Sequence, residues 1–310
     1  LYGMNFKSHE EIVTGEVDRP GELTETYGKP IWRGETEPIR LLVNCDFGIG
    51  DTIQYFRYCD EAKSRVKELI LRCDEDLHTL FEPYGYTLLK KDDPISKFDK
   101  ISHIMALPKV LGKKYIESTD KYLSVNYDKN PKQGLLDVIS LKNFSKIGIC
   151  WAGNQFSPRS IHRDLSPYFF ENCLPKMPFL SLQKQFEPPK GWLDCRGIMR
   201  DFNQTAALLE RLELVITVDT AIAHLAGALG VRTWLLLGQN ADPRWDEFTW
   251  KRNERVLGSV WEGSIVDEYY PPFPFVGDRI GRPRWYNSIK IFKGEWEAVR
   301  QFVQNEFSQL

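Results

Sequence analysis

Two polar stretches carry the residues most suited to chemistry, and each directly follows an apolar run. The first, CDFGIGD, ends in the carboxylate of Asp51. The second begins with Asp219 and Thr220 and continues as a run of small residues in which His224 falls one helical turn after Thr220. A carboxylate can act as a general base, and a helix that starts after a strand presents free N–H groups to an anion. The sequence therefore predicts a proton acceptor and a phosphate site.

Ordinary structural roles explain the same residues equally well at this stage. Asp51 could merely cap a helix that begins at Thr52, as aspartate often does. Asp219 and Thr220 could be an N-cap pair, with His224 a partly buried helix residue. Spacing alone leaves these alternatives open.

The elements that must position these residues alternate between buried strands and helices. Around the phosphate site, we expect strands at Leu214–Val218 and Val231–Leu237 and a helix from Ala221 to Leu229 that Gly230 ends. Around Asp51, we expect a strand at Ile39–Asn44 and a helix from Thr52 to Ala62. Further strands are expected at 67–73, 87–89, 100–105, 145–151 and 179–184, with helices at 76–84, after Asn203 as a possible cap, and at 295–310. Recurring βα units predict an α/β fold with parallel sheets.

The chain is long enough for two domains. We expect a leader at 1–38, a first domain at 39–134 and a second domain at 135–310. DKNPKQG (Asp128 to Gly134) is the expected linker, because it is polar and contains Pro and Gly. An aromatic and proline-rich segment at 251–284 looks like an insertion, and the C-terminal helix could cross back onto the first domain. Trp32 could pack against the first domain or lie in a solvated leader.

Composition argues against several classes of function. The 310 residues have a net charge of −2, which gives no general attraction to nucleic acid or anionic membranes. No apolar run approaches the ~18 residues of a membrane span. The six cysteines form no CxxC pair and have no histidine at zinc spacing. We therefore expect a reduced, cytoplasmic protein with no structural metal.

Four stretches resemble, in the same order, the motifs of family 9 glycosyltransferases, the ADP-heptose:lipopolysaccharide heptosyltransferase group. They are GIGDTIQYFRY, the WAGN loop, SLQK and VDTAIAHLAGALG. The last is closer still to the glycosyltransferase domains attached to tetratricopeptide-repeat proteins. The resemblance spans roughly residues 30–303 and implies a GT-B fold, in which two Rossmann-like domains face each other across a cleft.

The resemblance implies transfer of a sugar from a nucleotide-diphosphate sugar to an acceptor hydroxyl, with inversion and without a metal. Asp51 takes the place of the family's general base. The residues that would hold the donor are Asn154, Arg159, Arg163, Gln183, Lys184, Asp201, Asp219, Thr220, Ala221 and His224. Those on the acceptor side are Gly50, Gln54, Arg57 and His103. Ala221 stands where heptosyltransferases usually have glycine, which adds a methyl group near the phosphates.

A local excess of positive charge fits an anionic donor. Residues 141–200 contain nine Lys and Arg but only four Asp and Glu, in a chain whose net charge is negative. Arginine is well suited to bidentate contact with phosphate, which favours Arg163 as a donor ligand. An ordinary solvated loop is a credible alternative for His162 and less so for Arg163.

Three alternatives stay open. The chain could be a nucleotide-sugar epimerase or hydrolase, a catalytically silent binding module of a repeat protein, or a sugar transferase acting on modified DNA bases. The expected partners are a nucleotide sugar and an acceptor carbohydrate, lipid-linked glycan, protein or modified nucleic acid. No cofactor is expected beyond the donor itself.

Overall fold

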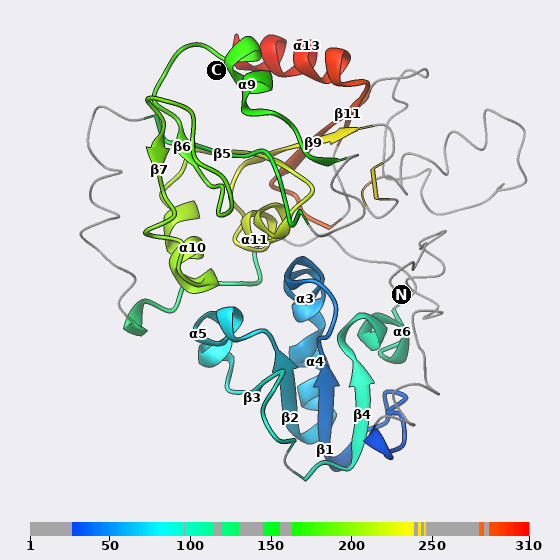
Figure 1. Ribbon diagram of the computed structural model, residues 1–310. Helices are drawn as coiled ribbons and strands as arrows, with labels where there is room; N and C mark the ends of the chain where they lie inside the picture. The colour runs from blue at the N-terminus through cyan, green and yellow to red at the C-terminus, as the bar shows by residue number, and fades with distance from the viewer. Residues whose placement is uncertain are drawn as a thin grey trace, which may run out of the picture.

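The computed structural model describes residues 27–95, 97–113, 120–129, 145–155, 163–238, 241–242, 245, 279–281 and 285–309. In these residues the chain forms two α/β domains, one above the other in Figure 1. Each domain is built on its own sheet, and the described helices include none long and apolar enough to span a membrane. The predicted α/β fold with parallel sheets is confirmed.

The first domain has a four-stranded parallel sheet in the order β3-β2-β1-β4. Its strands are β1 (Glu37–Asn44), β2 (Val66–Cys73), β3 (Thr87–Lys90) and β4 (Lys100–His103). Its helices and 3-10 turns are α3 (Ile49–Tyr55), η1 (Phe56–Tyr58), α4 (Cys59–Ser64), η2 (Glu75–Leu77), α5 (His78–Phe81), η3 (Glu82–Tyr84), η4 (Ile104–Ala106) and α6 (Leu107–Val110). The short turn η5 (Tyr127–Lys129) follows.

The helix expected at 52–62 forms as three pieces, α3, η1 and α4, and begins earlier than predicted. Gly48 is the N-cap of α3, so Asp51 occupies the third helical position instead of the cap. The 3-10 turn of η1 interrupts the helix at Phe56, whose ring stacks on Phe81 with centroids 3.9 Å apart. The helix expected at 76–84 is likewise divided among η2, α5 and η3.

Trp32 belongs to the first domain. Its side chain is fully buried, its backbone N–H donates to the carbonyl of Ile101 at 2.8 Å, and its indole N–H donates to the carbonyl of Glu35. Ile31 forms a parallel bridge to Ile101, which extends the sheet contacts of β4. Of the two alternatives for Trp32, packing on the first domain is therefore the correct one.

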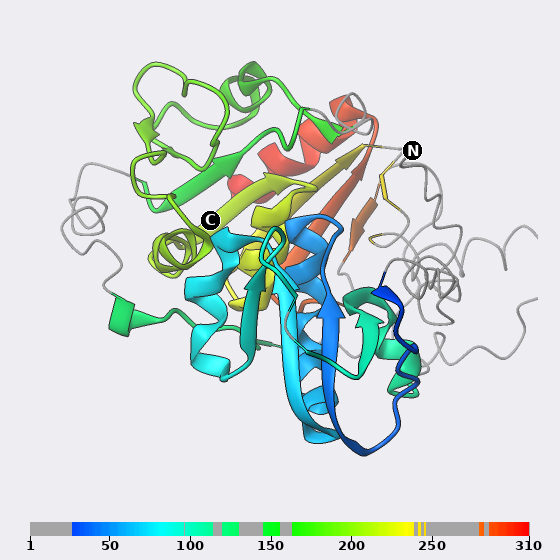
Figure 2. The same ribbon diagram turned by 60° about the horizontal axis from the view of Figure 1, so that its bottom comes forward.

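The second domain has a seven-stranded sheet in the order β10-β11-β9-β8-β5-β6-β7, parallel except that β10 runs antiparallel to β11. Its strands are β5 (Ile147–Cys150), β6 (Leu180–Ser181), β7 (Leu193–Asp194), β8 (Leu214–Val218), β9 (Thr233–Gly238), β10 (Arg279–Gly281) and β11 (Ile289–Gly294). Its helices are α9 (Pro167–Cys173), α10 (Phe202–Leu209), α11 (Ala221–Ala228) and α13 (Trp296–Phe307). Figure 2 shows these strands running side by side.

The βα unit in which we expect a phosphate site forms at α11 and the strands on either side of it. β8 is buried at every residue, α11 follows it, and β9 pairs with β8 in parallel. Gly230 has a φ of +72°, and a Cβ there would lie 2.7 Å from the carbonyl oxygen of Asp120. A left-handed residue in such close contact favours glycine, which explains where α11 ends.

The C-terminal helix covers the second sheet and does not cross back onto the first domain in the described residues. Val299 and Val303 of α13 are fully buried and belong to the same core as Trp234 and Phe292. Gln304 donates to the carbonyl of Asn172 in α9, and both helices lie at the top of Figure 1, away from the first domain. The apolar stripe of α13 is therefore already used by its own domain.

The cap of α10 is Asp201, whose carboxylate accepts from the backbone N–H of Gln204 at 2.7 Å. The prediction that Asn203 caps this helix is wrong. Asn203 is buried and its amide pairs twice with the backbone of Asn126, accepting at 2.8 Å and donating at 3.0 Å. This pair fastens the chain that leaves the first domain onto α10.

Two other expectations concern residues that lie largely outside the described part of the chain. Of the linker at 128–134, only Asp128 and Lys129 are described, and they end η5. Of the insertion at 251–284, only β10 is described. All six cysteines are buried and unbridged: Cys45, Cys59, Cys73, Cys150, Cys173 and Cys195.

Candidate active site between the two domains

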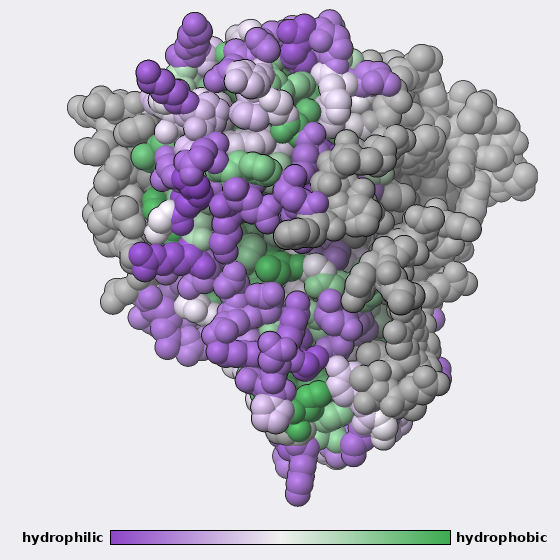
Figure 3. Space-filling view, in the orientation of Figure 1, coloured by the Kyte–Doolittle hydropathy of each residue, from purple (hydrophilic) through white to green (hydrophobic). Residues whose placement is uncertain are grey.

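The two domains meet where α3 and α11 begin. A Cβ built on Gly50, in the first turn of α3, would lie 2.8 Å from Cδ2 of His224 and 3.5 Å from Cα of Ala221. Since α3 directly follows β1 and α11 directly follows β8, the carboxyl ends of these two strands lead into this junction. Ligands of α/β proteins bind at such carboxyl ends. The described surface is mostly hydrophilic in Figure 3, with a small hydrophobic area close to the junction.

Asp51 lies one residue from this contact and is half-buried. Its carboxylate accepts from the backbone N–H of Gly48 at 3.2 Å, across the first turn of α3. That bond helps to satisfy the helix start, so a capping role is present in the structure. The same bond fixes the carboxylate in the first turn of α3, one residue after Gly50, which contacts α11.

A second carboxylate lies at the end of β1. Asp46 is exposed, and its Oδ1 lies 2.7 Å from Nε2 of His103 at the end of β4. Because Nδ1 of His103 accepts from the backbone N–H of Met105, the proton of the neutral ring is on Nε2 and is donated to Asp46. This hydrogen bond holds the pKa of Asp46 below its usual value, although partial burial opposes it. The ring of Phe47 packs edge-on against His103 with centroids 4.5 Å apart.

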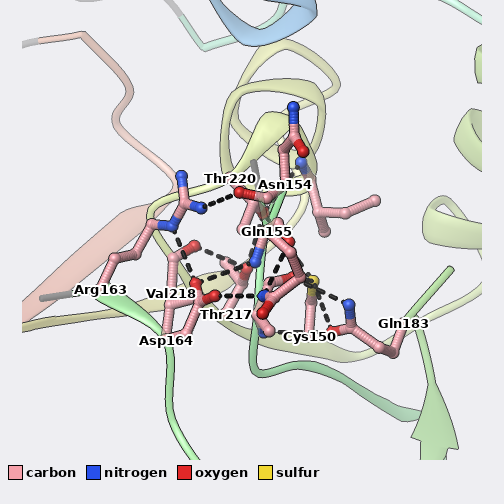
Figure 4. A network of polar contacts seen from close by, with 12 residues as sticks. Cys150, Asn154, Gln155, Arg163, Asp164, Gln183, Thr217, Val218 and Thr220 are labelled. Atoms are coloured by element: carbon pink, nitrogen blue, oxygen red, sulfur yellow. Dashed lines mark hydrogen bonds and ion pairs between the residues drawn. The ribbon is translucent and has the colours of Figure 1, made fainter. Parts of the chain in front are cut away.

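At the start of α11, Thr220 is the N-cap and its hydroxyl accepts from the backbone N–H of Ile222 at 3.2 Å. The hydroxyl also lies 3.2 Å from that of Thr217 and 3.9 Å from the thiol of Cys150 (Figure 4). Asp219 and Ala221 on either side are half-buried. The capping role that the sequence left open for Thr220 is therefore present, and it fixes the first turn of the helix at the carboxyl end of β8.

Beside this turn, the WAGN loop is held by Asp164. Oδ1 of Asp164 accepts from the backbone N–H of Gly153 and from Nε of Arg163, both at 3.0 Å. Arg163 also donates from Nη2 to the carbonyl of Asn154, and its guanidinium lies directly over Gly153. In Figure 4, the outer nitrogen of Arg163 and the side chain of Asn154 point to the side where the blue ribbon of the first domain lies.

The SLQK motif divides into a buried and an exposed residue. The amide of Gln183 is buried and pairs twice with the backbone of Ala152, accepting at 3.1 Å and donating at 3.0 Å. Gln183 therefore braces the WAGN loop. Lys184 is exposed, and its Nζ lies 3.3 Å from Oδ2 of Asp76 in the first domain.

His224 is buried at the domain junction, with 3% of its surface exposed. Its Nδ1 lies 3.0 Å from the hydroxyl of Tyr286, and its ring stacks on Trp245 with centroids 4.9 Å apart. The imidazole thus has a fixed orientation between α3 and the aromatic side chains of the second domain.

Gln54 and Arg57, expected on the acceptor side, lie deeper in the same junction. Gln54 is fully buried, and its carbonyl accepts from Nε of Arg57 at 3.0 Å. Nη1 of Arg57 donates to the carbonyl of Trp285 at 3.0 Å. The structure thus brings Asp51, Gly50, Gln54, Arg57, Ala221, Thr220 and His224 to one junction.

The remaining candidates have other partners or are not described. Asp201 caps α10, and His103 pairs with Asp46. Arg159 and His162 lie outside the described residues, as does Arg244. Within the described part of the chain, no group of three His, Cys, Asp or Glu side chains could hold a metal ion.

Sequence reasoning missed Asp46, Asp164 and Tyr286. Asp46 could have been found from its place, two residues after a buried strand. The interpretation of this stretch relied instead on its glycines and on Asp51. Asp164 directly follows Arg163, but this position alone does not show that its carboxylate bonds to the backbone of the WAGN loop. Tyr286 is 62 residues from His224, and no local pattern signals such a contact.

Comparisons with known proteins concern part of the second domain and the overall fold. Residues 199–265 match the family model described as Glycosyltransferase family 9 (heptosyltransferase), and this segment contains α10, β8, α11 and β9. No curated protein matches the chain.

Several solved structures are similar in fold. One is a bacterial iron-containing dodecameric glycosyltransferase, TibC, from enterotoxigenic E. coli H10407. Its TM-score is 0.51 at 14% identity, and the match covers 89% of this chain and 76% of that one. A second structure of TibC, the heptosyltransferase in complex with ADP-D-beta-D-heptose, has a TM-score of 0.46 at 13% identity. The match covers 67% of this chain and 61% of that one. A glycosyl transferase family 9 from Veillonella parvula DSM 2008 has a TM-score of 0.48 at 12% identity. The match covers 74% of this chain and 92% of that one.

The fold is therefore GT-B, with two α/β domains that each have their own sheet and that meet at α3 and α11. The family match in the second domain supports a glycosyltransferase. The closer likeness to the repeat-attached domains stays a prediction.

Proposed function

We propose that the chain transfers a sugar from a nucleotide-diphosphate sugar to an acceptor hydroxyl. The observation that carries this proposal is the contact of Gly50 with Ala221 and His224, which brings Asp51 to the start of α11. A proton acceptor and a helix N-terminus at one junction are what group transfer from a diphosphate requires. The segment that includes α11 is also the one that matches the glycosyltransferase family.

The donor's diphosphate would bind at the start of α11. A helix N-terminus attracts negative charge, and the hydroxyl of Thr220 and the imidazole of His224 flank it. Arg163 adds a cation close by, on the loop that Asp164 and Gln183 brace. Lys184 is held only by an exposed ion pair with Asp76, and such pairs contribute about 0–1 kcal/mol. Lys184 could therefore leave Asp76 and bind a phosphate at little cost in free energy.

In the reaction, Asp51 accepts the proton of the acceptor hydroxyl as its oxygen attacks C1 of the sugar. A bond forms between that oxygen and C1, and the bond from C1 to the diphosphate oxygen breaks. Its electron pair leaves with the nucleoside diphosphate. Attack opposite to the leaving group inverts C1. The fixed positive groups around α11 would stabilise the developing charge in the role that a metal ion has elsewhere.

A calorimetric screen tests the donor site first. We expect one of ADP, GDP, UDP, CDP or TDP to bind the wild-type protein and to lose binding in Asp219→Ala. Asp128→Ala removes an exposed carboxylate in η5 and is the matched control, which should bind normally. If no nucleotide binds, the proposal fails and a silent module becomes the better interpretation.

Turnover tests the reaction itself. With the sugar nucleotide identified by the screen, release of nucleoside diphosphate should require an acceptor from a panel of glycans, lipid-linked glycans, peptides and modified DNA. Asp51→Asn should abolish transfer while donor binding remains. Donor turnover without any acceptor would instead indicate a hydrolase or an epimerase, and salt-dependent binding of DNA would indicate the nucleic-acid alternative.

A further inference from the structure

Arg57 is a buried cation in an aromatic enclosure at the junction of the domains. Its guanidinium carbon lies 4.4 Å from the ring centroid of Tyr122, 5.0 Å from that of Tyr286 and 5.6 Å from that of Trp285. Burial lowers the pKa of Arg57, but the neighbouring phenols of Tyr122 and Tyr286 raise it above its usual value. The side chain therefore stays charged in this enclosure.

The enclosure joins three separated parts of the chain. Arg57 comes from η1 of the first domain, Tyr122 from the connection between the domains, and Trp285 and Tyr286 from the segment before β11. The hydroxyl of Tyr122 donates to the carbonyl of Ile53 at 2.9 Å, which ties the connection to α3. Arg57 is consequently bound to both domains at once.

Tyr286 extends this enclosure to the donor helix. Its ring lies on Gly227 of α11 so closely that a Cβ there would be 2.4 Å from the ring. Its hydroxyl lies 3.0 Å from Nδ1 of His224. A chain of contacts thus runs from Arg57 through Tyr286 to the imidazole that flanks the start of α11.

The direction of the last hydrogen bond favours one of the two neutral tautomers of His224. A cation over the ring face of a phenol makes its O–H a stronger donor, so Tyr286 is suited to donate to Nδ1. The proton of the neutral imidazole is then on Nε2. The edge of the ring that includes Nε2 faces Gly50, since a Cβ there would lie 3.6 Å from Nε2 and 2.8 Å from Cδ2.

We propose that Arg57 and Tyr286 are positioning residues that hold His224 in its Nε2–H form, so that this N–H can donate to the donor's diphosphate. The proposal rests on the proposed function, because it gives His224 a phosphate to bind. It also explains why Arg57 bonds both domains. The helix start and the imidazole are correctly placed only when the first domain supplies the cation.

The tautomer can be measured without any ligand. Long-range proton–nitrogen NMR of the protein distinguishes the two neutral forms, and His224→Gln identifies the signal of His224 among the five histidines. We expect the Nε2–H form in the wild type at neutral pH. Tyr286→Phe should give a mixture of both forms. An Nδ1–H form in the wild type overturns the proposal, whether or not a nucleotide binds.

The functional consequence is measured with the nucleotide that the calorimetric screen identifies. Tyr286→Phe removes one hydrogen bond and should weaken its binding about tenfold, the effect of about 1.4 kcal/mol. Arg57→Met should weaken it similarly and Arg57→Lys less, since lysine keeps the charge. Unchanged affinity in Tyr286→Phe, with binding abolished in Asp219→Ala, would overturn the positioning role while the donor site stands.

A matched control separates this effect from general loss of packing. Tyr84→Phe removes another phenol at the connection, where Tyr84 accepts from the backbone N–H of Ser124 and donates to the carbonyl of Tyr122. It touches neither Arg57 nor His224 in any described contact. We expect Tyr84→Phe to keep both the tautomer of His224 and the nucleotide affinity. If Tyr84→Phe weakens binding as much as Tyr286→Phe, the loss reflects general destabilisation, and the positioning role is overturned.

Discussion

Gly50 and His224 are packed so tightly that no methyl group fits between them, because a Cβ on Gly50 would lie 2.8 Å from Cδ2 of the imidazole. The ring cannot withdraw easily, since Trp245 stacks on it and Tyr286 bonds its Nδ1. The spacing of the two domains at their strand ends is therefore set by the absence of a side chain on α3.

Gly50→Ala should force the domains apart at this point. Overpacking of this kind costs about 1–3 kcal/mol, and the shift of α11 should also weaken nucleotide binding. Thermal unfolding and calorimetry measure the two effects. Gly197→Ala is the control, because a Cβ there would meet no atom within 4 Å. Equal melting temperatures for both variants would contradict the close contact.

Gly153→Ala tests Arg163 without removing it. A Cβ at Gly153 would lie 2.5 Å from Nη2 of Arg163, and the far end of an arginine can move aside at low cost. We expect nearly unchanged stability but weaker nucleotide binding, because the guanidinium leaves its place beside Asp164. Chemical denaturation with calorimetry measures both. A normal affinity would mean that Arg163 does not contact the donor.

Asn203→Ala should destabilise the protein by about 2–4 kcal/mol, because two buried backbone groups of Asn126 lose their partner. Asn203→Asp should cost more at neutral pH, since a carboxylate then faces the carbonyl of Asn126. Its pKa would be raised in the folded state, so part of the loss should be recovered as the pH falls and the group is protonated. Urea denaturation at several pH values measures this difference. Asn172→Ala, at an exposed position of α9, should change stability by less than about 0.5 kcal/mol.

Asp46→Asn should remove a pH-dependent contribution to stability. The pKa of Asp46 is lowered in the folded state, chiefly by the hydrogen bond from His103. Its stabilising effect is therefore complete above the unfolded pKa of about 3.9 and is lost as the pH falls through the lowered pKa. The difference in urea midpoint between wild type and variant should be largest near pH 6–7 and shrink below pH 4. Asp92→Asn, an exposed carboxylate of the same domain, should show a smaller difference.

Much of the fold follows from local patterns in the sequence. The buried runs at β1, β2, β8 and β9 contain consecutive branched or aliphatic residues, which predict strands without reference to the rest of the chain. The start and end of α11 were also predictable, because Thr220 is a favourable cap and Gly230, two residues after the last alanine, favours a helix end.

The features that could not be predicted all depend on contacts distant in sequence. Asn203 has the residue type of a cap, and only its pairing with Asn126, 77 residues away, shows that it is not one. The amphipathic pattern of α13 predicts a helix but does not say which domain its stripe covers. Arg57 resembles an acceptor-side residue by position, and its aromatic enclosure appears only when Tyr122 and Tyr286 are brought together.

The six buried cysteines can be used to detect local unfolding of each domain. Cys45, Cys59 and Cys73 lie in the first domain, and Cys150, Cys173 and Cys195 in the second. Burial raises the pKa of Cys73, Cys173 and Cys195 to about 12 and that of Cys150 to about 11. Little thiolate is therefore present in the folded state, and alkylating reagents react with these thiols only after local unfolding. The alkylation rates of the two groups of thiols would show whether the domains open separately or together, and a bound nucleotide that joins them should make the two rates converge.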